Sequence, residues 1–266
     1  MTVAITAERR DGVVWLSIAR PQQMNALSTE VITELARHIA AASSSVDDRV
    51  IVVTGTGSVF CAGADLLEAR DKTASSTAFR SWLALWRDTF RAIERCPKPV
   101  IAALNGATLA GGLELALACD VMIAADTAVI GDVHCRYGLV PGGGGSQRLP
   151  EAVGTRRARW LMYTGSTLTA TEARDWGLVQ EVVDHRVFRE SVHRTAATMA
   201  RRSSASFAVM KRLSTPGAIT DEGLDMEIEA AAQLIVGPDA REGLAAFFDK
   251  RDPVFAGAPA SGQRRT

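Results

Sequence analysis

Side chains that can move protons lie close together just before a run of four glycines. The segment AVIGDVHCRYGLVPGGGGSQRLP spans residues 128–150 and places Asp132 two residues before His134. An imidazole titrates near neutral pH, so His134 is suited to general acid–base catalysis. In an extended segment, residues i and i+2 face the same way, and Asp132 would then orient the His134 ring. The alternative is that His134 is only a wall of a pocket.

Glu114 is a second candidate because it lies in an apolar segment, LELALAC, residues 113–119. We expect a helix there, in whose first turn the helix dipole favours the ionised carboxylate while apolar neighbours raise its pKa. A carboxylate in apolar surroundings is costly unless it has a partner or a function. Glu114 is therefore a candidate catalytic residue, and a salt-bridged surface glutamate is the alternative.

Two glycine-bearing turns each connect a predicted strand to a predicted helix. They are CAGADL, residues 61–66, and AGGLE, residues 110–114. At the start of a helix, backbone N–H groups have no partner within the helix and can bind an anion or a developing oxyanion. The small residues of the second turn would let a ligand reach the N–H of Gly111. For the first turn, the alternative is that Asp65 only caps its own helix.

Alternating strands and helices must position these groups. Short apolar or β-branched runs predict strands at 13–18, 50–54, 100–104, 121–125 and 179–183. Helical spacing and N-cap residues predict helices at 28–42, 79–95, 151–164 and 169–176, with others opening at Asp65 and within LAGGLELALACD. This alternation predicts an α/β core with largely parallel strands.

The last part of the chain has a different character. From Val187 onward the sequence predicts helices separated by Pro216 and Pro238. We therefore divide the chain into a core, residues 1–186, and a helical C-terminal region, residues 187–266. This region is expected to pack on its own core or on a neighbouring subunit.

Composition and charge exclude several classes of function. Lys+Arg and Asp+Glu both total 30, so the net charge is zero and favours neither nucleic-acid nor membrane binding. The four cysteines form no CxxC pair, so no metal site is expected. The GTGSVFCAG segment has Phe60 where a dinucleotide fingerprint needs glycine, and no Lys-Ser/Thr pair follows GGGG. We expect a cytoplasmic protein without an N-terminal secretory signal.

Six segments together resemble the crotonase (enoyl-CoA hydratase/isomerase) family over nearly the full chain. In order, they are RPQQMNALS, FCAGADL, PVIAALNGATLAGGLELALACD, GLVPGGGGSQRLPEAVG, TGSTLTATEARDWGLVQEVV and REGLAAFFDKR. The resemblance implies a crotonase-like spiral of ββα turns and a homotrimer or dimer of trimers. It also implies an acyl-CoA substrate, with neither a metal nor a redox cofactor.

The resemblance also assigns roles to individual residues. Ala64 and Gly111 would supply the two N–H donors for the thioester oxygen, and Glu114 matches one of the two catalytic glutamates of hydratases. The positions expected to contact substrate or CoA are Met24, Ala26, Ala62, Asp65, Leu66 and Lys250. Lys250 matches a family position near the CoA nucleotide, which is often contributed by a neighbouring subunit. The family position that often stacks on adenine is Ala231 here, a departure from the pattern. Trp82, Trp86 and Tyr137 are expected to line the pocket.

The most consequential departure concerns the second catalytic glutamate of hydratases, which lies twenty residues after the first. That position is His134 here. Hydration of a 2-enoyl-CoA is the main expectation, with Glu114 and His134 as the pair. Asp132 would enter the site itself if the loop differs by a residue or two. The alternatives are an enoyl-CoA isomerase using Glu114 alone, a hydrolase or C–C bond-cleaving enzyme using His134, and a catalytically silent CoA-binding protein.

Overall fold

The computed structural model describes residues 3–72, 75–214 and 237–257, together with residues 225, 228, 229, 231, 233 and 235. Its larger sheet has six strands in the order β1-β2-β3-β5-β7-β10. These strands are β1 (Ile5–Arg10), β2 (Val13–Ile18), β3 (Val50–Gly55), β5 (Val100–Leu104), β7 (Val121–Ala125) and β10 (Glu181–Val183). Among the described strands of this sheet, only β1 and β2 pair in antiparallel fashion. The predicted parallel core is confirmed, whereas β1 was not predicted.

A second, smaller sheet holds four short strands in the order β4-β6-β8-β9. They are β4 (Val59–Cys61), β6 (Ala107–Leu109), β8 (Val129–Gly131) and β9 (Leu168–Thr169). The chain passes from β3 to β4, from β5 to β6 and from β7 to β8, and so adds one strand to each sheet in every turn. This arrangement is the expected ββα spiral. The residue runs alone did not predict these strands, which are two or three residues long.

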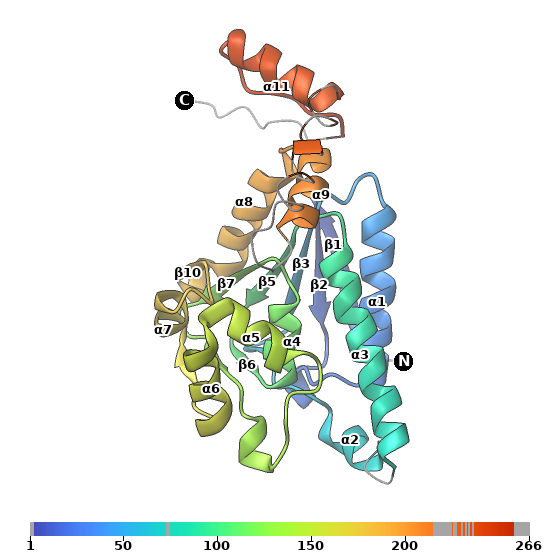
Figure 1. Ribbon diagram of the computed structural model, residues 1–266, viewed down its shortest axis with the longest axis vertical. Coiled ribbons are helices and arrows are strands. Elements are labelled where there is room, and N and C mark those ends of the chain that lie inside the picture. Colours follow the sequence, from blue (N-terminus) through green and yellow to red (C-terminus); the bar gives the residue numbers. More distant parts are fainter. Residues whose placement is uncertain are drawn as a thin grey trace.

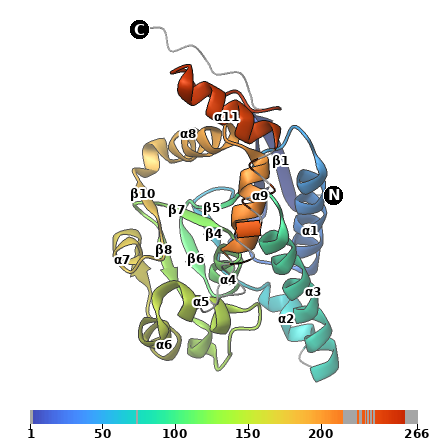
Figure 2. The ribbon, with the colours of Figure 1, turned by 45° about the horizontal axis from the view of Figure 1, so that its top comes forward.

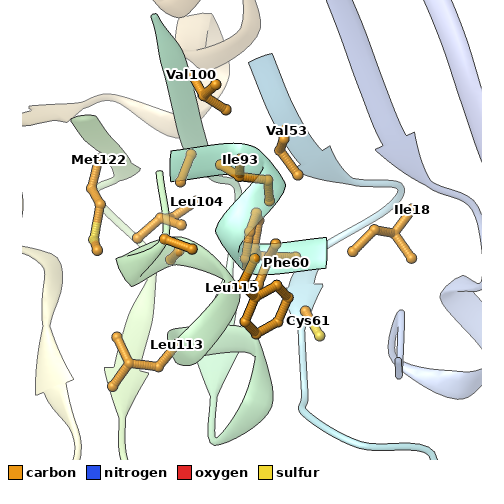
Figure 3. Close-up of a cluster of buried hydrophobic side chains, with 14 of the residues drawn as sticks. Ile18, Val53, Phe60, Cys61, Ile93, Val100, Leu104, Leu113, Leu115 and Met122 are labelled. Carbon is orange, nitrogen blue, oxygen red and sulfur yellow. The ribbon is translucent and has the colours of Figure 1, made fainter. Parts of the chain in front are cut away.

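Helices cover both faces of the larger sheet (Figure 1). The helices α1 (Thr29–Ser44) and α3 (Ser76–Arg95) pack on one face, and α8 (Phe188–Ala200) packs on the other. All residues of β2 and β3 are buried, as expected for strands covered on both faces. Alternate residues enter two cores, and the larger one gathers side chains from β3, β4, β5, α3 and α4 (Figure 3).

The other helices surround the smaller sheet or follow the core (Figure 2). They are α2 (Leu66–Lys72), α4 (Gly111–Leu117), α5 (Gly145–Val153), α6 (Thr155–Thr164), α7 (Ala170–Asp175), α9 (Ser204–Leu213) and α11 (Pro238–Phe248). Short 3-10 helices are η1 (Pro21–Gln23), η2 (His134–Tyr137) and η3 (His185–Val187). No helix within the described residues is both long and apolar enough to cross a membrane.

Most predicted helix starts are confirmed, but one predicted helix is wrong. Ser28 caps α1 and Thr169 caps α7, as expected. The single helix predicted over 151–164 is instead two helices, α5 and α6, and α5 begins at Gly145. Gly154 separates them because its φ of +81° is outside the helical region. Pro216 lies outside the described residues.

The buried Arg49 ties the start of β3 to the helical C-terminal region. Its guanidinium donates to the carbonyl oxygens of Ala200 at 2.6 Å, Arg202 at 2.7 Å and Ala256 at 2.9 Å. Ala200 is the last residue of α8 and Arg202 lies two residues beyond it, where α8 supplies no further N–H donors. Ala256 lies in the segment that follows α11. Arg49 therefore fastens two separate parts of the C-terminal region to the core.

Candidate active site

Two loops predicted to contact CoA run side by side at the end of the sheets. Leu27 N–H donates to Gly63 O at 2.8 Å, and Asp65 N–H donates to Leu27 O at 3.0 Å. Ala62 N–H donates to Met24 O at 3.1 Å. These bonds bring Met24 and the buried Ala26 next to the turn that carries Ala64.

The N–H groups of Ala64 and Gly111 lie next to each other. A Cβ atom on Gly111 would lie 3.4 Å from Ala64 N, and one on Gly63 would lie 3.3 Å from Gly111 N. In the described part of the chain, neither N–H donates to another backbone group. The backbone that presents Gly111 is strained, since Ala110 has φ +48° and ψ −118°. This geometry can present two donors to one oxygen atom.

Asp65 has contacts that account for its carboxylate without a ligand. Its Oδ1 accepts from the N–H groups of Leu67 at 3.2 Å and Glu68 at 3.3 Å, as a helix N-cap does. Its Oδ2 accepts from Arg20 at 2.8 Å. The structure therefore supports the N-cap alternative for this side chain.

Aromatic side chains lie next to the N–H groups of Ala64 and Gly111. Trp86 is buried, and a Cβ atom on Gly111 would lie 2.7 Å from its Cζ3. Trp82 packs edge-on against Trp86 with ring centroids 5.1 Å apart. Tyr137, by contrast, is 69% exposed. The structure places Trp86 directly against Gly111, and Tyr137 mostly in solvent.

Glu114 is buried to 2% exposure and is held by the backbone of the glycine run. Its Oε1 accepts from the N–H groups of Gly143 and Gly145, each at 2.8 Å. Side chains would block this approach, because a Cβ atom on Gly143 would lie 3.0 Å from Oε2 and one on Gly145 would lie 3.1 Å from Oε1. The two N–H groups fix one carboxylate oxygen and leave the other free.

The buried Asp132 pairs with His134, which is partly buried. Oδ1 of Asp132 lies 2.8 Å from Nδ1 of His134 and also accepts from the backbone N–H of His134 at 3.2 Å. The contact between these two side chains is thus present, although the segment is not extended at His134. His134 begins the 3-10 helix η2, and the carboxylate of Asp132 bends toward the backbone N–H and the ring Nδ1 of His134.

The opposite ring nitrogen of His134 faces Glu114. Nε2 of His134 lies 3.8 Å from Oε2 of Glu114, the oxygen that the glycines leave free. The His134 side chain is 12% exposed, so the pair is largely shielded from bulk water. The structure therefore brings together all three side chains that could move protons, while Asp132 lies behind the ring.

Burial and neighbouring charges shift the acidities of this pair. Burial raises the pKa of Glu114 above its ordinary value, although the N–H groups of Gly145 and Gly143 and the charge of His134 oppose the shift. Burial lowers the pKa of His134, but the hydrogen bond and charge of Asp132, with the charge of Glu114, outweigh it and raise the pKa overall. The raised pKa of Glu114 moves this carboxyl toward the range useful for proton transfer near neutral pH.

Other predicted contact residues are dispersed. Leu66 is 61% exposed at the start of α2. Lys250 is exposed just after α11, which lies well apart from α4 and α5 in both views (Figures 1 and 2). Ala231 is helical and exposed. Within this single chain, Lys250 is therefore not beside the Ala64 and Gly111 donors.

The described residues contain a possible metal-binding cluster and a large cavity, both apart from the Glu114 cluster. Asp126, Asp184 and His185 could share a metal ion, but they are surface groups and include no member of the Glu114 cluster. A cavity of about 1250 Å³ lies between α3, α5 and α9. Gly143 and Arg148 line it, but its described lining lacks Ala64, Gly111, Glu114, Asp132 and His134.

Sequence reasoning missed the part that the glycine run plays at the site. The glycines lead into α5, and they also supply the N–H groups that bind Glu114. The signal was the glycine run itself, because close approach of a backbone to another group requires residues without a Cβ.

Comparisons with known proteins agree with this architecture. A family model described as enoyl-CoA hydratase/isomerase matches residues 8–258. Crotonyl-CoA hydratase of Syntrophomonas wolfei is 36% identical over 254 residues, covering 94% of this chain and 97% of that protein. Enoyl-CoA isomerase/hydratase of Mycosarcoma maydis is 35% identical over 257 residues, covering 92% and 93%.

A solved structure shows the same fold. The crystal structure of enoyl-CoA hydratase from Bacillus anthracis has a TM-score of 0.91 and 36% identity, covering 96% of this chain and 99% of that chain. The two-sheet spiral is thus the fold of crotonase enzymes. The chain belongs to the enoyl-CoA hydratase/isomerase family, as its motifs predicted, and is an enzyme of that family.

Proposed function

We propose that this enzyme hydrates a 2-enoyl-CoA to a 3-hydroxyacyl-CoA, with Glu114 and His134 as the catalytic pair. The observation that carries the proposal is the 3.8 Å separation of Glu114 Oε2 and His134 Nε2. A water molecule about 2.8 Å from each atom can be held between them. The N–H groups of the glycine run hold the other oxygen of Glu114, and Asp132 holds the other ring nitrogen of His134.

The proposed reaction begins with the water. Oε2 of Glu114 accepts a proton while the water oxygen forms a bond to C3 of the substrate. The C2–C3 π electrons move toward the thioester, whose oxygen becomes an enolate oxygen. The N–H groups of Ala64 and Gly111 donate to that oxygen, and loss of one such donor typically costs about 3 kcal/mol of transition-state stabilisation.

The second proton transfer completes the addition. Nε2 of the His134 imidazolium donates its proton to C2 as the enolate collapses, leaving neutral imidazole and protonated Glu114. Proton transfer from Glu114 to His134 restores both groups. Because Oε2 and Nε2 are neighbours, OH and H reach the same face of the alkene.

Asp132 supports the charged form of the histidine in this proposal. Its carboxylate accepts from Nδ1 and stabilises the imidazolium by charge. The reaction balances with water and the thioester alone, so we propose no metal or redox cofactor. Coenzyme A enters as part of the substrate.

Isomerisation is the second candidate, because one free carboxylate oxygen can carry a proton between two carbons. Purified protein should be assayed in parallel with crotonyl-CoA, a 3-enoyl-CoA and a β-ketoacyl-CoA, with Glu114→Ala as the inactive control. Hydration of crotonyl-CoA is expected. Turnover of only the 3-enoyl-CoA would establish isomerisation, and cleavage of only the β-ketoacyl-CoA would establish C–C hydrolysis. CoA binding without turnover of any substrate would identify a silent binding protein.

We further propose that residues 187–266 contribute to a homotrimer or a dimer of trimers. Leu244, Phe247 and Phe248 on α11 are exposed in a single chain, which supports burial against another copy. Lys250 follows this patch and would then reach the CoA of a neighbouring subunit. Light scattering after size-exclusion chromatography tests the proposal, since a monomeric mass would contradict it. The four free cysteines support a cytoplasmic location.

A further inference from the structure

The glycine run that holds Glu114 is itself held by a charged side chain. Nη1 of Arg148 donates to the carbonyl oxygen of Gly143 at 2.7 Å. Gly143 is also one of the two residues whose N–H binds Oε1 of Glu114. Gly143 thus binds the Arg148 guanidinium through its carbonyl oxygen and the Glu114 carboxylate through its N–H.

Arg148 is anchored to a second element. Its Nε donates to Oε1 of Glu94 on α3, and the other carboxylate oxygen of Glu94 accepts from Arg91 at 2.8 Å. The Arg148 side chain is 15% exposed, so its bond to Glu94 is partly shielded from water. Arg148 therefore tethers the glycine run to α3, a helix of twenty residues.

The loop needs such a tether because it is built from four glycines. Glycine has more backbone freedom to lose than any other residue, and Gly144 adopts φ +104°. A Cβ atom on Gly144 would lie 2.0 Å from Nη1 of Arg148, so the absence of a side chain also makes room for the guanidinium. No side chain of the loop itself can hold the two N–H groups in place.

We propose that Arg148 is a positioning residue for Glu114. By holding the Gly143 carbonyl, it keeps the N–H groups of Gly143 and Gly145 on Oε1 and leaves Oε2 facing His134 and the substrate. The inference rests on the catalytic role proposed for Glu114. Arg148 acts through the loop and not by contact with the substrate.

The effect of Arg148 on the carboxyl of Glu114 can be distinguished from the effects of the other groups around that carboxyl. The charged groups that act on its carboxyl are His134 and Asp132, on the η2 side, while α3 presents the apolar Phe90 next to Gly143. N–H donors favour the ionised carboxylate. Loosening the loop therefore raises the pKa of Glu114 although neither His134 nor Asp132 is replaced.

The test is Arg148→Met in the full-length enzyme, with Arg91→Met as the matched control. Both changes remove an arginine bonded to Glu94, but only Arg148 touches the loop. We expect Arg148→Met to lower kcat by about 10-fold to 100-fold through misplacement of Glu114, with little change in KM. The limb of the pH–rate profile that rises as Glu114 ionises should move to higher pH. Arg91→Met should resemble wild type.

A second variant and a second readout cover a failure to fold. Arg148→Lys keeps the charge but replaces the planar fork by one nitrogen, so it should show the same upward shift. Carbon-13 NMR of labelled glutamate, assigned with Glu114→Gln, measures the carboxyl pKa without turnover. A wild-type pKa of Glu114 in Arg148→Lys would overturn the inference. Full activity of Glu114→Gln would instead overturn the catalytic role of Glu114, whatever Arg148 does.

Discussion

Nε2 of His134 lies 3.8 Å from Oε2 of Glu114, a separation too long for a direct hydrogen bond and short enough for one water to bridge. Different parts of the chain fix the two atoms. Asp132 holds the far side of the imidazole, and the backbone of the glycine run holds the far oxygen of the carboxylate. We propose that this chain has a two-group site in which His134 takes the place expected for the second glutamate.

Asp132→Asn should move the alkaline limb of the pH–rate profile to lower pH. The carboxylate raises the pKa of His134, and the imidazolium is the proposed proton donor to C2. Activity is therefore lost as pH rises through the pKa of His134, and removing the carboxylate lowers that pKa. Measurement of kcat/KM for crotonyl-CoA across the titration range of histidine checks this outcome.

Asp126→Asn is the matched control for this change. Asp126 binds the ring and the backbone N–H of His185 in the same way, both at 3.0 Å, but on the surface. Its variant should keep the wild-type profile. An unshifted limb in Asp132→Asn would show that this carboxylate does not set the acidity of the proposed proton donor, His134.

Gly112→Ala should lower both stability and activity. A Cβ atom at this position would lie 2.2 Å from the carbonyl oxygen of Cys61, so α4 and β4 must separate. That overpacking is expected to cost about 1–3 kcal/mol of unfolding free energy. It would also move Gly111 away from Ala64 and so lower kcat.

Urea unfolding and steady-state kinetics on the same samples measure both effects. Gly243→Ala serves as the control, because within the described part of a single chain nothing lies within 4 Å of a Cβ atom there, in the middle of α11. Alanine should stabilise that helix by about 0.5–1 kcal/mol. Equal stability of Gly112→Ala and wild type would show that the contact between α4 and β4 is not tight.

Arg49→Met should loosen the C-terminal region from the core. The change leaves three carbonyl groups without their charged donor and is expected to cost on the order of 3 kcal/mol. Urea unfolding measures the loss, and limited proteolysis should cut earlier within residues 201–257. Arg37→Met, which removes an exposed pair with Glu34, should change neither result. Equal protease resistance of Arg49→Met and wild type would show that Arg49 does not fasten the C-terminal region to the core.

Sequence alone predicted the large sheet better than the small one. Strands such as β2 and β3 are continuous apolar runs, because both faces are covered, and such runs are visible without a structure. β4, β6, β8 and β9 are two or three residues long, too short for any periodicity. The division of 151–164 into two helices depended on the backbone of one residue, Gly154.

For the candidate active site, the sequence indicated which residue types take part but not how they are arranged in space. Glu114 stood out as a carboxylate in an apolar segment, and Gly111 as a small residue at a turn. The bond of Asp132 to His134 comes from a turn and not from the expected alternation, and the glycine N–H bonds to Glu114 join residues far apart in the chain. Such long-range contacts have no signature in local spacing.

The most direct test of the Glu114–His134 pair is a double-mutant cycle on crotonyl-CoA hydration. The four proteins are wild type, Glu114→Gln, His134→Gln and the double variant, each checked for unchanged folding. If the pair holds one water, each single change should lower kcat by about 100-fold to 10,000-fold. The double change should then lower it little further than the worse single change, because the two groups act as a unit. Full activity of His134→Gln would contradict the pair and leave Glu114 to act alone.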